Sequence, residues 1–352
     1  MSRPDHEQIP SHTDTDVSGG PHPPRVRRMA WLPLFLLTAV VAVLVVLVLN
    51  RTSGTARVRP ADQTETTAGQ TFNHYFTEAA GITWHHVETG DGDPIVFLHG
   101  IPGAWFSWHS VMAQLSDQYR TVALDMKGLG LTEPGSSTFN LSVVAGETVA
   151  LLDALGIERF ALVSHEWGAV AASYIAAQYP QRVTHLIRLQ TPISDAALAQ
   201  INTLKSVPSI GMAVLGDGEG FVRRMYTGAV SSLLMANVPG NVVTVPLEES
   251  VIARIAQEFS YAGIPQAIVN YYTDTPTQLR ETLFALAADT PMPVLLLQAD
   301  SDPIQPLTFY TDAAAAFPNA VYRVIPNAGH APMLEQPETV AGLIHSFVSG
   351  TF

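Results

Sequence analysis

The chain has 352 residues, no cysteine and a formal net charge of −13, and 47% of its residues are hydrophobic. The length allows one large globular domain with an appendage. The absence of cysteine excludes disulfides, thiolate metal sites and a cysteine nucleophile. Most acidic residues follow Arg59, and a body this acidic repels nucleic acid, so nucleic acid is not a predicted partner.

The N-terminal part divides into three segments. Residues 1–28 are polar and rich in Ser, Asp, His and Pro, which predicts a disordered tail. Within residues 29–50, the run from Met29 to Leu49 is apolar except for Pro33 and Thr38, and its length matches the hydrocarbon core of a bilayer. We therefore predict a single transmembrane anchor; a cleaved signal peptide is the alternative, but the run is long for one and shows no small-residue cleavage site. Residues 51–71 are rich in Thr, Gly and Ala and predict a flexible linker.

The orientation of the anchor follows from its flanking charges. Three closely spaced arginines precede the apolar run, and three more widely spaced ones follow it. The positive-inside bias predicts a cytoplasmic tail and an extracytoplasmic catalytic body on a single-pass membrane protein.

In the body, strands and helices alternate. Short, continuous apolar runs predict buried strands at 94–98, 121–125, 159–164, 183–189, 293–298 and 320–325. Helical patterns lie between them, which predicts a doubly wound, mostly parallel α/β sheet. We assign the core to residues 72–191 and 291–352.

Residues 192–290 interrupt this order. The interval has helical periodicity but no convincing core strand. Because ligands of open α/β sheets bind at the carboxyl ends of the strands, an insertion leaving that edge is expected to form a helical cap over the site.

Five short segments follow predicted strands: His99–Gly103, Asp125–Gly130, Ser164–Gly168, Asp300–Pro303 and Asn327–His330. Each is weak evidence by itself. Their order is informative, because a nucleophile on a sharp strand-to-helix turn, then an acid, then a late histidine is the chain order of α/β-hydrolases.

These segments resemble the α/β-hydrolase superfamily and, within it, the epoxide hydrolases and haloalkane dehalogenases. The resemblance covers about residues 72–352. It rests on His99-Gly-Ile-Pro-Gly103, on Ser164-His-Glu-Trp-Gly-Ala169 and on Gly329-His-Ala-Pro-Met-Leu-Glu-Gln-Pro-Glu338. The tryptophan that follows the elbow residue is typical of members with a carboxylate nucleophile.

The resemblance implies a two-step mechanism. Glu166 aligns with the nucleophile and would form an alkyl ester. His330, oriented by Asp302, would activate the water that hydrolyses this ester. The backbone N–H groups of Trp167 and Ile101 would form the oxyanion hole.

Cap tyrosines protonate the ring oxygen in epoxide hydrolases. Asn270-Tyr-Tyr272 resembles the segment that supplies one, which indicates Tyr272, with Tyr271 as the neighbour most easily confused with it. Tyr226 and Tyr261 are candidates for a second. The expected substrate-binding side chains are those of His99, Pro102, Trp105, Tyr271 and Tyr261.

Glutamate replaces the aspartate that is usual at the elbow. The change moves the carboxylate outward by one C–C bond, about 1.5 Å, and a displacement of about 1 Å can cost about a hundredfold in rate. A non-catalytic binding or sensor protein on a hydrolase fold therefore stays an alternative to an epoxide hydrolase.

Two other enzyme classes compete. A haloalkane dehalogenase would share Glu166 and Trp167 but needs a second halide donor, and Ile101 stands where many dehalogenases have asparagine. A serine esterase is disfavoured because Ser164 lies two residues before the apex and the chain has no G-x-S-x-G. No cofactor or metal is implied. The predicted anchor suggests a small lipophilic substrate drawn from the membrane.

Overall fold

The computed structural model describes residues 56–57, 64–190, 218–227, 242–274, 279–307, 317 and 320–352. The predicted tail and membrane anchor, residues 1–50, lie outside this part of the chain. Within it, no helix is both long enough and apolar enough to cross a membrane.

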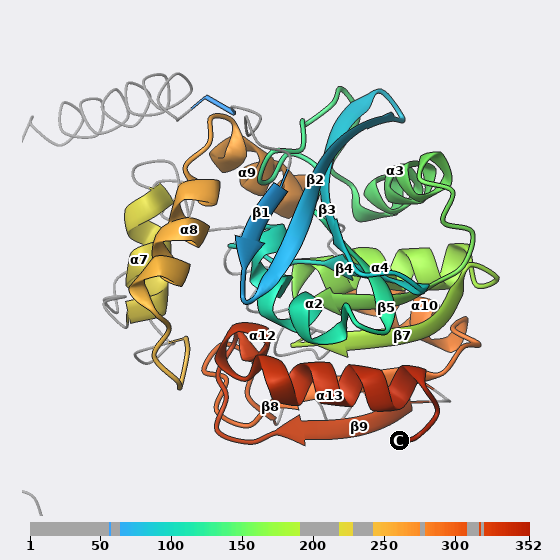
Figure 1. The fold of residues 1–352 in the computed structure, drawn as a ribbon. Coiled ribbons are helices and arrows are strands. Elements are labelled where there is room, and N and C mark those ends of the chain that lie inside the picture. Colours follow the sequence, from blue (N-terminus) through green and yellow to red (C-terminus); the bar gives the residue numbers. More distant parts are fainter. Residues whose placement is uncertain are drawn as a thin grey trace, which may run out of the picture. The chain divides into compact units, whose positions relative to one another are not determined.

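The described residues form one sheet, ordered β1-β2-β3-β5-β4-β6-β7-β8-β9 (Figure 1). Its strands are β1 Thr64–Thr67, β2 Gln70–Ala79, β3 Ile82–Thr89, β4 Asp93–Leu98, β5 Tyr119–Leu124, β6 Phe160–His165, β7 Val183–Leu189, β8 Val294–Ala299 and β9 Ala320–Ile325. From β5 onward along this order the neighbours run parallel, whereas β1, β2 and β3 join antiparallel. The predicted α/β fold is confirmed, and its six predicted strands are β4 to β9.

The antiparallel edge corrects the predicted linker. β1 lies inside residues 51–71 and pairs with β2 through a register that starts at Thr64 and Asn73. Arg57 also contacts the body, because its Nη2 donates to the carbonyl of Gly128 at 2.6 Å. The folded body therefore begins before residue 72, and a fragment that starts at 71 would lose an edge strand.

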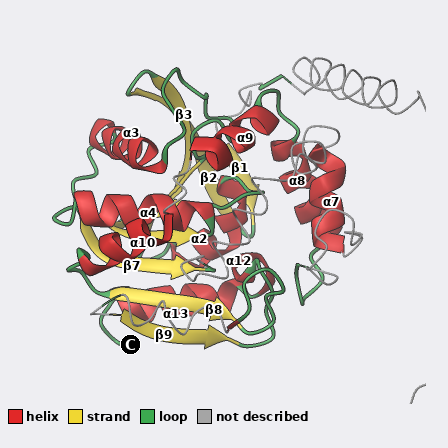
Figure 2. Cartoon of the chain, turned by 180° about the vertical axis from the view of Figure 1, so that it is seen from behind, coloured by secondary structure: helices red, strands yellow, loops and turns green. Residues whose placement is uncertain are grey.

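Helices cover both faces of the sheet (Figure 2). On one face lie α3 Leu141–Ala154, α4 Trp167–Gln178 and α10 Leu279–Ala288; on the other lie η1 Trp105–Trp108, α2 His109–Leu115, α12 Pro332–Glu335 and α13 Pro337–Val348. Strands β4, β6 and β8 are almost fully buried between these layers. This double burial explains why they read as continuous apolar runs.

The interval between β7 and β8 is helical where it is described. It contains α7 Gly218–Thr227, α8 Glu249–Phe259, α9 Ile264–Asp274 and α10. Helices α7 and α8 pack on each other, whereas α10 packs on α4 against the sheet. The predicted cap boundary at residue 290 is therefore too late, because α10 belongs to the sheet's helical layer.

Candidate active site

Glu166 stands at the turn between β6 and α4. Its backbone adopts φ +49° and ψ −115°, a conformation that is strained for a residue with a side chain. The turn also requires a close neighbour without a side chain: a Cβ on Gly100 would lie 2.7 Å from the Cβ of Glu166. A strained residue at this turn is the arrangement of a nucleophile elbow.

Two backbone donors hold one oxygen of this carboxylate. Oε2 of Glu166 accepts from the N–H of Ile101 at 2.9 Å and from the N–H of Trp167 at 2.7 Å. The residues predicted as the oxyanion hole thus converge on a single point. Because Oε2 is held, Oε1 is the oxygen available to attack an electrophile.

Opposing effects act on the charge of Glu166. Burial raises its pKa to about 7, although the charge of His330 and the N–H groups of Ile101 and Trp167 oppose the rise. The carboxylate is therefore ionised above neutral pH and gains a proton readily below it.

His330 and Asp302, which the sequence predicts to be an acid–base pair, are hydrogen-bonded to each other. Nδ1 of His330 donates to Oδ2 of Asp302 at 2.9 Å, and the other oxygen of Asp302 accepts from the N–H groups of Ile304 at 2.8 Å and Gln305 at 3.0 Å. Burial lowers the pKa of His330, but Asp302 and then Glu166 outweigh it, so that the pKa is raised. Burial likewise opposes the ionisation of Asp302, and His330 nevertheless keeps its pKa low.

Burial and the charge of Glu166 raise the pKa of two cap tyrosines. The pKa of Tyr272 is raised by burial and then by Glu166, and the same two causes, with Glu335 between them, raise that of Tyr226. The ring of Tyr272 also lies edge-on to that of Trp167, with centroids 4.9 Å apart. The charges that act on Tyr261 come instead from Glu258, Arg254 and Asp125. Tyr226 is therefore the better placed candidate for the second tyrosine.

Three side chains that were expected to contact the substrate are buried in the interior of the protein. Nδ1 of His99 donates to the carbonyl of Gly100 at 2.7 Å and its Nε2 accepts from the N–H of Met126 at 3.0 Å, so both ring nitrogens are occupied. Trp105 is buried against Phe72. Tyr271 is fully buried, and its hydroxyl donates to the carbonyl of Lys127 at 3.0 Å.

We therefore correct the expectation that His99, Trp105 and Tyr271 bind substrate. His99 and Trp105 follow a predicted strand and Tyr271 precedes Tyr272 in the cap, but the three side chains are buried in the interior. Pro102 and Tyr261 remain partly exposed and stay candidates.

Sequence reasoning missed two residues that hold the histidine loop. Nε2 of buried His165 donates to the carbonyl of His330 at 2.8 Å, and burial followed by the charge of His330 lowers the pKa of His165 to about 3. Glu335 is buried, and its carboxylate accepts from four backbone N–H groups between 2.6 and 3.3 Å, those of Thr244, Val245, Gly329 and Ala331. The quoted motif contains Glu335, but only the fold reveals what it binds.

The described part of the chain contains no group of three or more His, Asp or Glu side chains that could hold a metal ion.

A family model described as the alpha/beta hydrolase fold matches residues 93–337 of this chain. The chain belongs to the α/β-hydrolase fold family. This match spans the elbow, the acid and the histidine, and it confirms the resemblance that the motifs indicated.

The hydrolase is also similar to several epoxide hydrolases. It is 35% identical to epoxide hydrolase 2 of Siraitia grosvenorii over 45% of its own length and 50% of the relative's. It is 26% identical to epoxide hydrolase 3 of Xenopus tropicalis over 85% of its own length and 83% of the relative's. The chain thus spans only 50% and 53% of the first two relatives it matches, the second being bifunctional epoxide hydrolase 2 of Mus musculus.

Solved structures agree on the fold. The epoxide hydrolase VrEH1 from Vigna radiata superposes with a TM-score of 0.66 at 25% identity, covering 83% of this chain and 100% of that one.

Proposed function

We propose that this hydrolase opens epoxides to vicinal diols through a covalent ester on Glu166. The observation that carries the proposal is that two backbone N–H groups bind the Glu166 carboxylate, while the His330–Asp302 pair and two tyrosines interact electrostatically with it. Epoxide hydrolases among the relatives support it.

In the first step, Oε1 of Glu166 attacks an epoxide carbon and the ring C–O bond breaks. Tyr272, assisted by Tyr226, donates a proton to the leaving oxygen. The raised pKa values keep both phenols protonated at neutral pH, so that they act as donors. The product is an alkyl ester that carries a neutral hydroxyl group.

In the second step, His330 takes a proton from water, and the resulting hydroxide attacks the carbonyl carbon of the ester. The negative charge develops on Oε2, which is the oxygen that the N–H groups of Ile101 and Trp167 already hold. The intermediate then collapses, and the diol oxygen takes its proton from His330. The second proton of the attacking water, left on the Glu166 carboxyl, returns to the Tyr272 phenolate, so that both residues are regenerated. Glutamate thus fits the site with its oxyanion contacts intact.

The test is diol formation by the full-length chain in detergent with a panel of aliphatic and aromatic epoxides. Glu166→Gln should abolish diol formation, and Tyr272→Phe should reduce it by about a hundredfold, within the usual contribution of a general acid. Tyr322→Phe on edge strand β9 is the matched control and should match the wild type.

A single turnover in ¹⁸O-water separates the ester route from direct attack by water. With enzyme in excess, the ester route places the label in the Glu166 carboxylate and leaves the diol unlabelled. Label in the first-turnover diol would overturn the covalent mechanism. If no epoxide is opened and no reagent alkylates Glu166, the binding-protein alternative is favoured.

One observation favours dehalogenation as a second candidate. The indole N–H of Trp167 is buried and makes no well-formed hydrogen bond to any described residue, although it lies near enough to Tyr272 to lower the pKa of that phenol slightly. A buried, unused N–H beside the nucleophile could bind a leaving halide. Halide release from haloalkanes without diol formation from epoxides would favour this alternative.

We further propose that residues 29–50 anchor the hydrolase in a membrane with the body on the extracytoplasmic side, where it takes small lipophilic substrates.

A further inference from the structure

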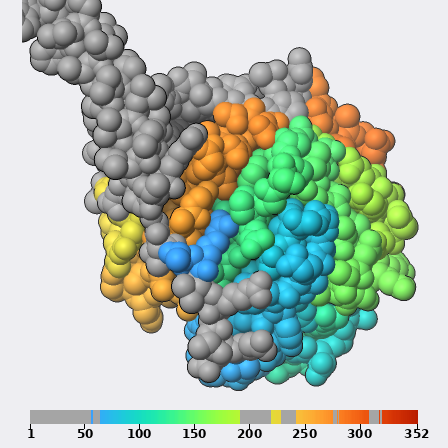
Figure 3. Space-filling view, turned by 90° about the horizontal axis from the view of Figure 1, so that it is seen from above, coloured from blue at the N-terminus to red at the C-terminus, as the bar shows by residue number. Residues whose placement is uncertain are grey.

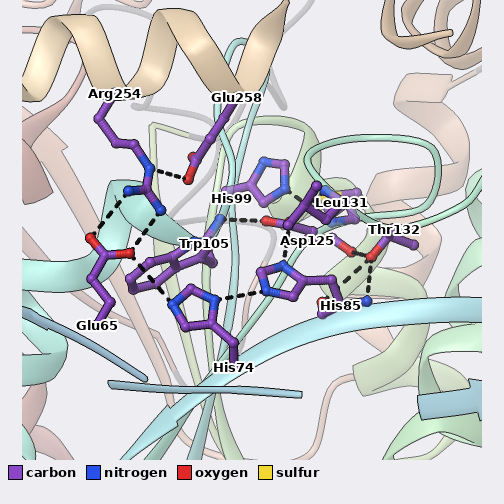
Figure 4. A network of polar contacts seen from close by, with 11 residues as sticks. Glu65, His74, His85, His99, Trp105, Asp125, Leu131, Thr132, Arg254 and Glu258 are labelled. Atoms are coloured by element: carbon purple, nitrogen blue, oxygen red, sulfur yellow. Dashed lines mark hydrogen bonds and ion pairs between the residues drawn. The ribbon is translucent and has the colours of Figure 1, made fainter. Parts of the chain in front are cut away.

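A second polar network lies beside the active site and is not used in the proposed mechanism. It runs from helix α8, through strands β1, β2 and β3, to the loop that follows β5 (Figure 4). The surface of β1 lies next to that of the α8–α9 segment (Figure 3). The network therefore joins the inserted helices to the sheet.

Asp125 is the inner end of the network and is almost fully buried. Its Oδ1 accepts from the N–H of Trp105 at 2.8 Å, and its Oδ2 accepts from the N–H of Leu131 at 2.8 Å and from Nδ1 of His85 at 2.7 Å. Burial opposes its ionisation, but His85 keeps the pKa of Asp125 low. Asp125 is thus a buried carboxylate with every bond directed at a backbone or histidine donor.

These bonds fix the loop that carries the oxyanion donor. The N–H of Ile101 lies between two anchored positions: His99, bonded to the N–H of Met126 beside Asp125, and Trp105, bonded to Asp125 itself. A shift of Asp125 would therefore move both ends of the segment that presents Ile101 to Glu166.

The two histidines, His85 and His74, connect Asp125 to Glu65 through a chain of polar contacts. Asp125 accepts from Nδ1 of His85, so Nε2 of His85 is left to accept from Nδ1 of His74, 3.0 Å away. Nε2 of His74 is then a bare acceptor that faces the Glu65 carboxylate at 3.5 Å. Two acceptors repel each other, so Glu65 needs a cation here.

Arg254 of α8 supplies the cation. Its Nη1 and Nη2 donate to the two oxygens of Glu65 at 3.2 and 2.9 Å, and its Nε donates to Glu258 at 2.8 Å. The guanidinium also lies 5.9 Å from the ring centroid of Trp105 and 5.2 Å from that of Phe106. Arg254 thus touches the residues that follow the oxyanion loop and balances the carboxylate at the outer end of the histidine pair.

We propose that Arg254 is a positioning residue, which through Glu65, His74, His85 and Asp125 holds the oxyanion loop in the geometry that catalysis requires. The role assigned to catalysis rests on the proposed hydrolysis, whereas the mechanical link does not. A bidentate arginine suits this role because its planar fork fixes direction as well as charge.

The electrostatic balance of the histidine pair depends on the groups around it. Without Arg254, Glu65 would lose the cation that its two oxygens bind. The charged and titratable groups that face the histidine pair are Glu65 from β1, His86 from β3, Asp125 after β5, and Arg254 and Glu258 from α8. Burial raises the pKa of Glu258 to about 8, although the charge of Arg254 opposes this rise.

The experiment compares Arg254→Gln, Glu65→Gln and the double variant of the full-length chain, with Arg254→Lys as the conservative variant. Arg223→Gln is the matched control, because Arg223 pairs with Glu219 and Glu249 on the exposed side of the same helices. The first readout is amide hydrogen exchange in residues 99–105, which does not depend on epoxide hydrolysis.

We expect Arg254→Gln to speed exchange in residues 99–105 and to lower kcat about tenfold with KM changed less than about twofold. The double variant should lose no more than the worse single one, since the two residues act through one link. Arg254→Lys should recover part of the loss.

Exchange that changes only in α8 and β1, or effects equal to those of Arg223→Gln, would overturn the proposal. Additive losses in the double variant would do the same. If the wild type opens no epoxide, the proposed function fails, while the exchange result still decides whether Arg254 holds the loop.

Discussion

At the scale of single residues, the position of the Glu166 carboxylate decides how this site works. The longer side chain still places Oε2 on the N–H groups of Ile101 and Trp167, at 2.9 and 2.7 Å. The extra methylene is accommodated because Gly100 leaves room at the turn. The turn thus holds a glutamate with both donors engaged, and we expect the shorter aspartate to reach them less well.

We therefore predict that Glu166→Asp lowers kcat/KM for an epoxide by about a hundredfold, because it withdraws the carboxylate by more than about 1 Å. Initial rates of diol formation measure this, and a thermal unfolding curve confirms that the variant is folded. An aspartate variant as active as the wild type would show that the contacts seen here are not those of the reacting enzyme.

The raised pKa of Glu166 also predicts how stability depends on pH. The pKa in the folded state is about 7, above the ordinary value of 4.5, so the folded state loses stability as pH rises from about 4.5 through 7. Glu166→Gln removes this cost. The variant should equal the wild type near pH 4.5 and exceed it above pH 7 by on the order of 2 kcal/mol, allowing for partial exposure.

Urea unfolding of both proteins at several pH values tests this. A constant difference between them would contradict the assigned pKa. Activity should follow the same group, since only the ionised carboxylate attacks: kcat/KM should fall about tenfold per pH unit below about 7.

Residue-scale prediction from the sequence succeeded where a motif names a backbone turn. The turn and the loop before it identify Glu166, Ile101 and Trp167, and the structure brings them together. It failed for His99 and Tyr271, because a place after a strand or beside another tyrosine does not reveal which way a side chain points. The hydrogen bonds from Met126 to His99 and from Tyr271 to Lys127 join residues distant in the chain.

At the scale of elements, Glu335 joins the histidine loop to the segment that precedes α8. The segment packs so closely on Gly329 that a Cβ there would overlap the backbone of Val242 and Val243. The Glu335 carboxylate then accepts N–H donors from both sides, including those of Thr244 and Gly329. The Glu335 carboxylate therefore holds the inserted segment and the loop of His330 together.

Glu335→Gln should destabilise the protein by about 2–3 kcal/mol, because an amide presents donors to backbone N–H groups that need a charged acceptor. It should also lower kcat more than it raises KM, since His330 loses its support. Urea unfolding and steady-state kinetics measure the two effects. Glu338→Gln, on the exposed side of α13, is the control. Equal effects from both variants would show that Glu335 does not hold the two segments together.

Element-scale prediction depended on burial. The six parallel strands were identified from apolar runs, whereas the antiparallel strands β1, β2 and β3 were missed. Strands β1 and β2 are largely polar and mostly exposed or half-buried, and β3 is buried but carries several polar residues between its apolar ones. The end of the cap was misplaced for a related reason. The residues of α10 follow a helical pattern, and a pattern alone does not distinguish a helix that packs on α4 from one that covers the site.

At the scale of the whole molecule, the charge distribution and the N-terminal apolar run suggest where the hydrolase works. The run of residues 29–50 lies outside the described residues, so the prediction of an anchor depends on its length and on the arginines that flank it. The hydrolase body does not need this segment for its fold, because the family match begins at residue 93 and the sheet at Thr64.

We predict that the full-length chain stays with the membrane after an alkaline carbonate wash, and that a chain starting at residue 52 is released yet keeps its activity on a water-soluble epoxide. The shorter chain retains Arg57 and β1, so its body should unfold at the same temperature.

Protease added to sealed spheroplasts should cleave the body and leave the N-terminal tail intact. An N-terminus found near residue 50 by mass spectrometry would instead indicate a cleaved signal peptide, and a protected body would reverse the orientation. If the anchor delivers substrate, the full-length chain in vesicles should surpass the short one only for epoxides that partition into lipid.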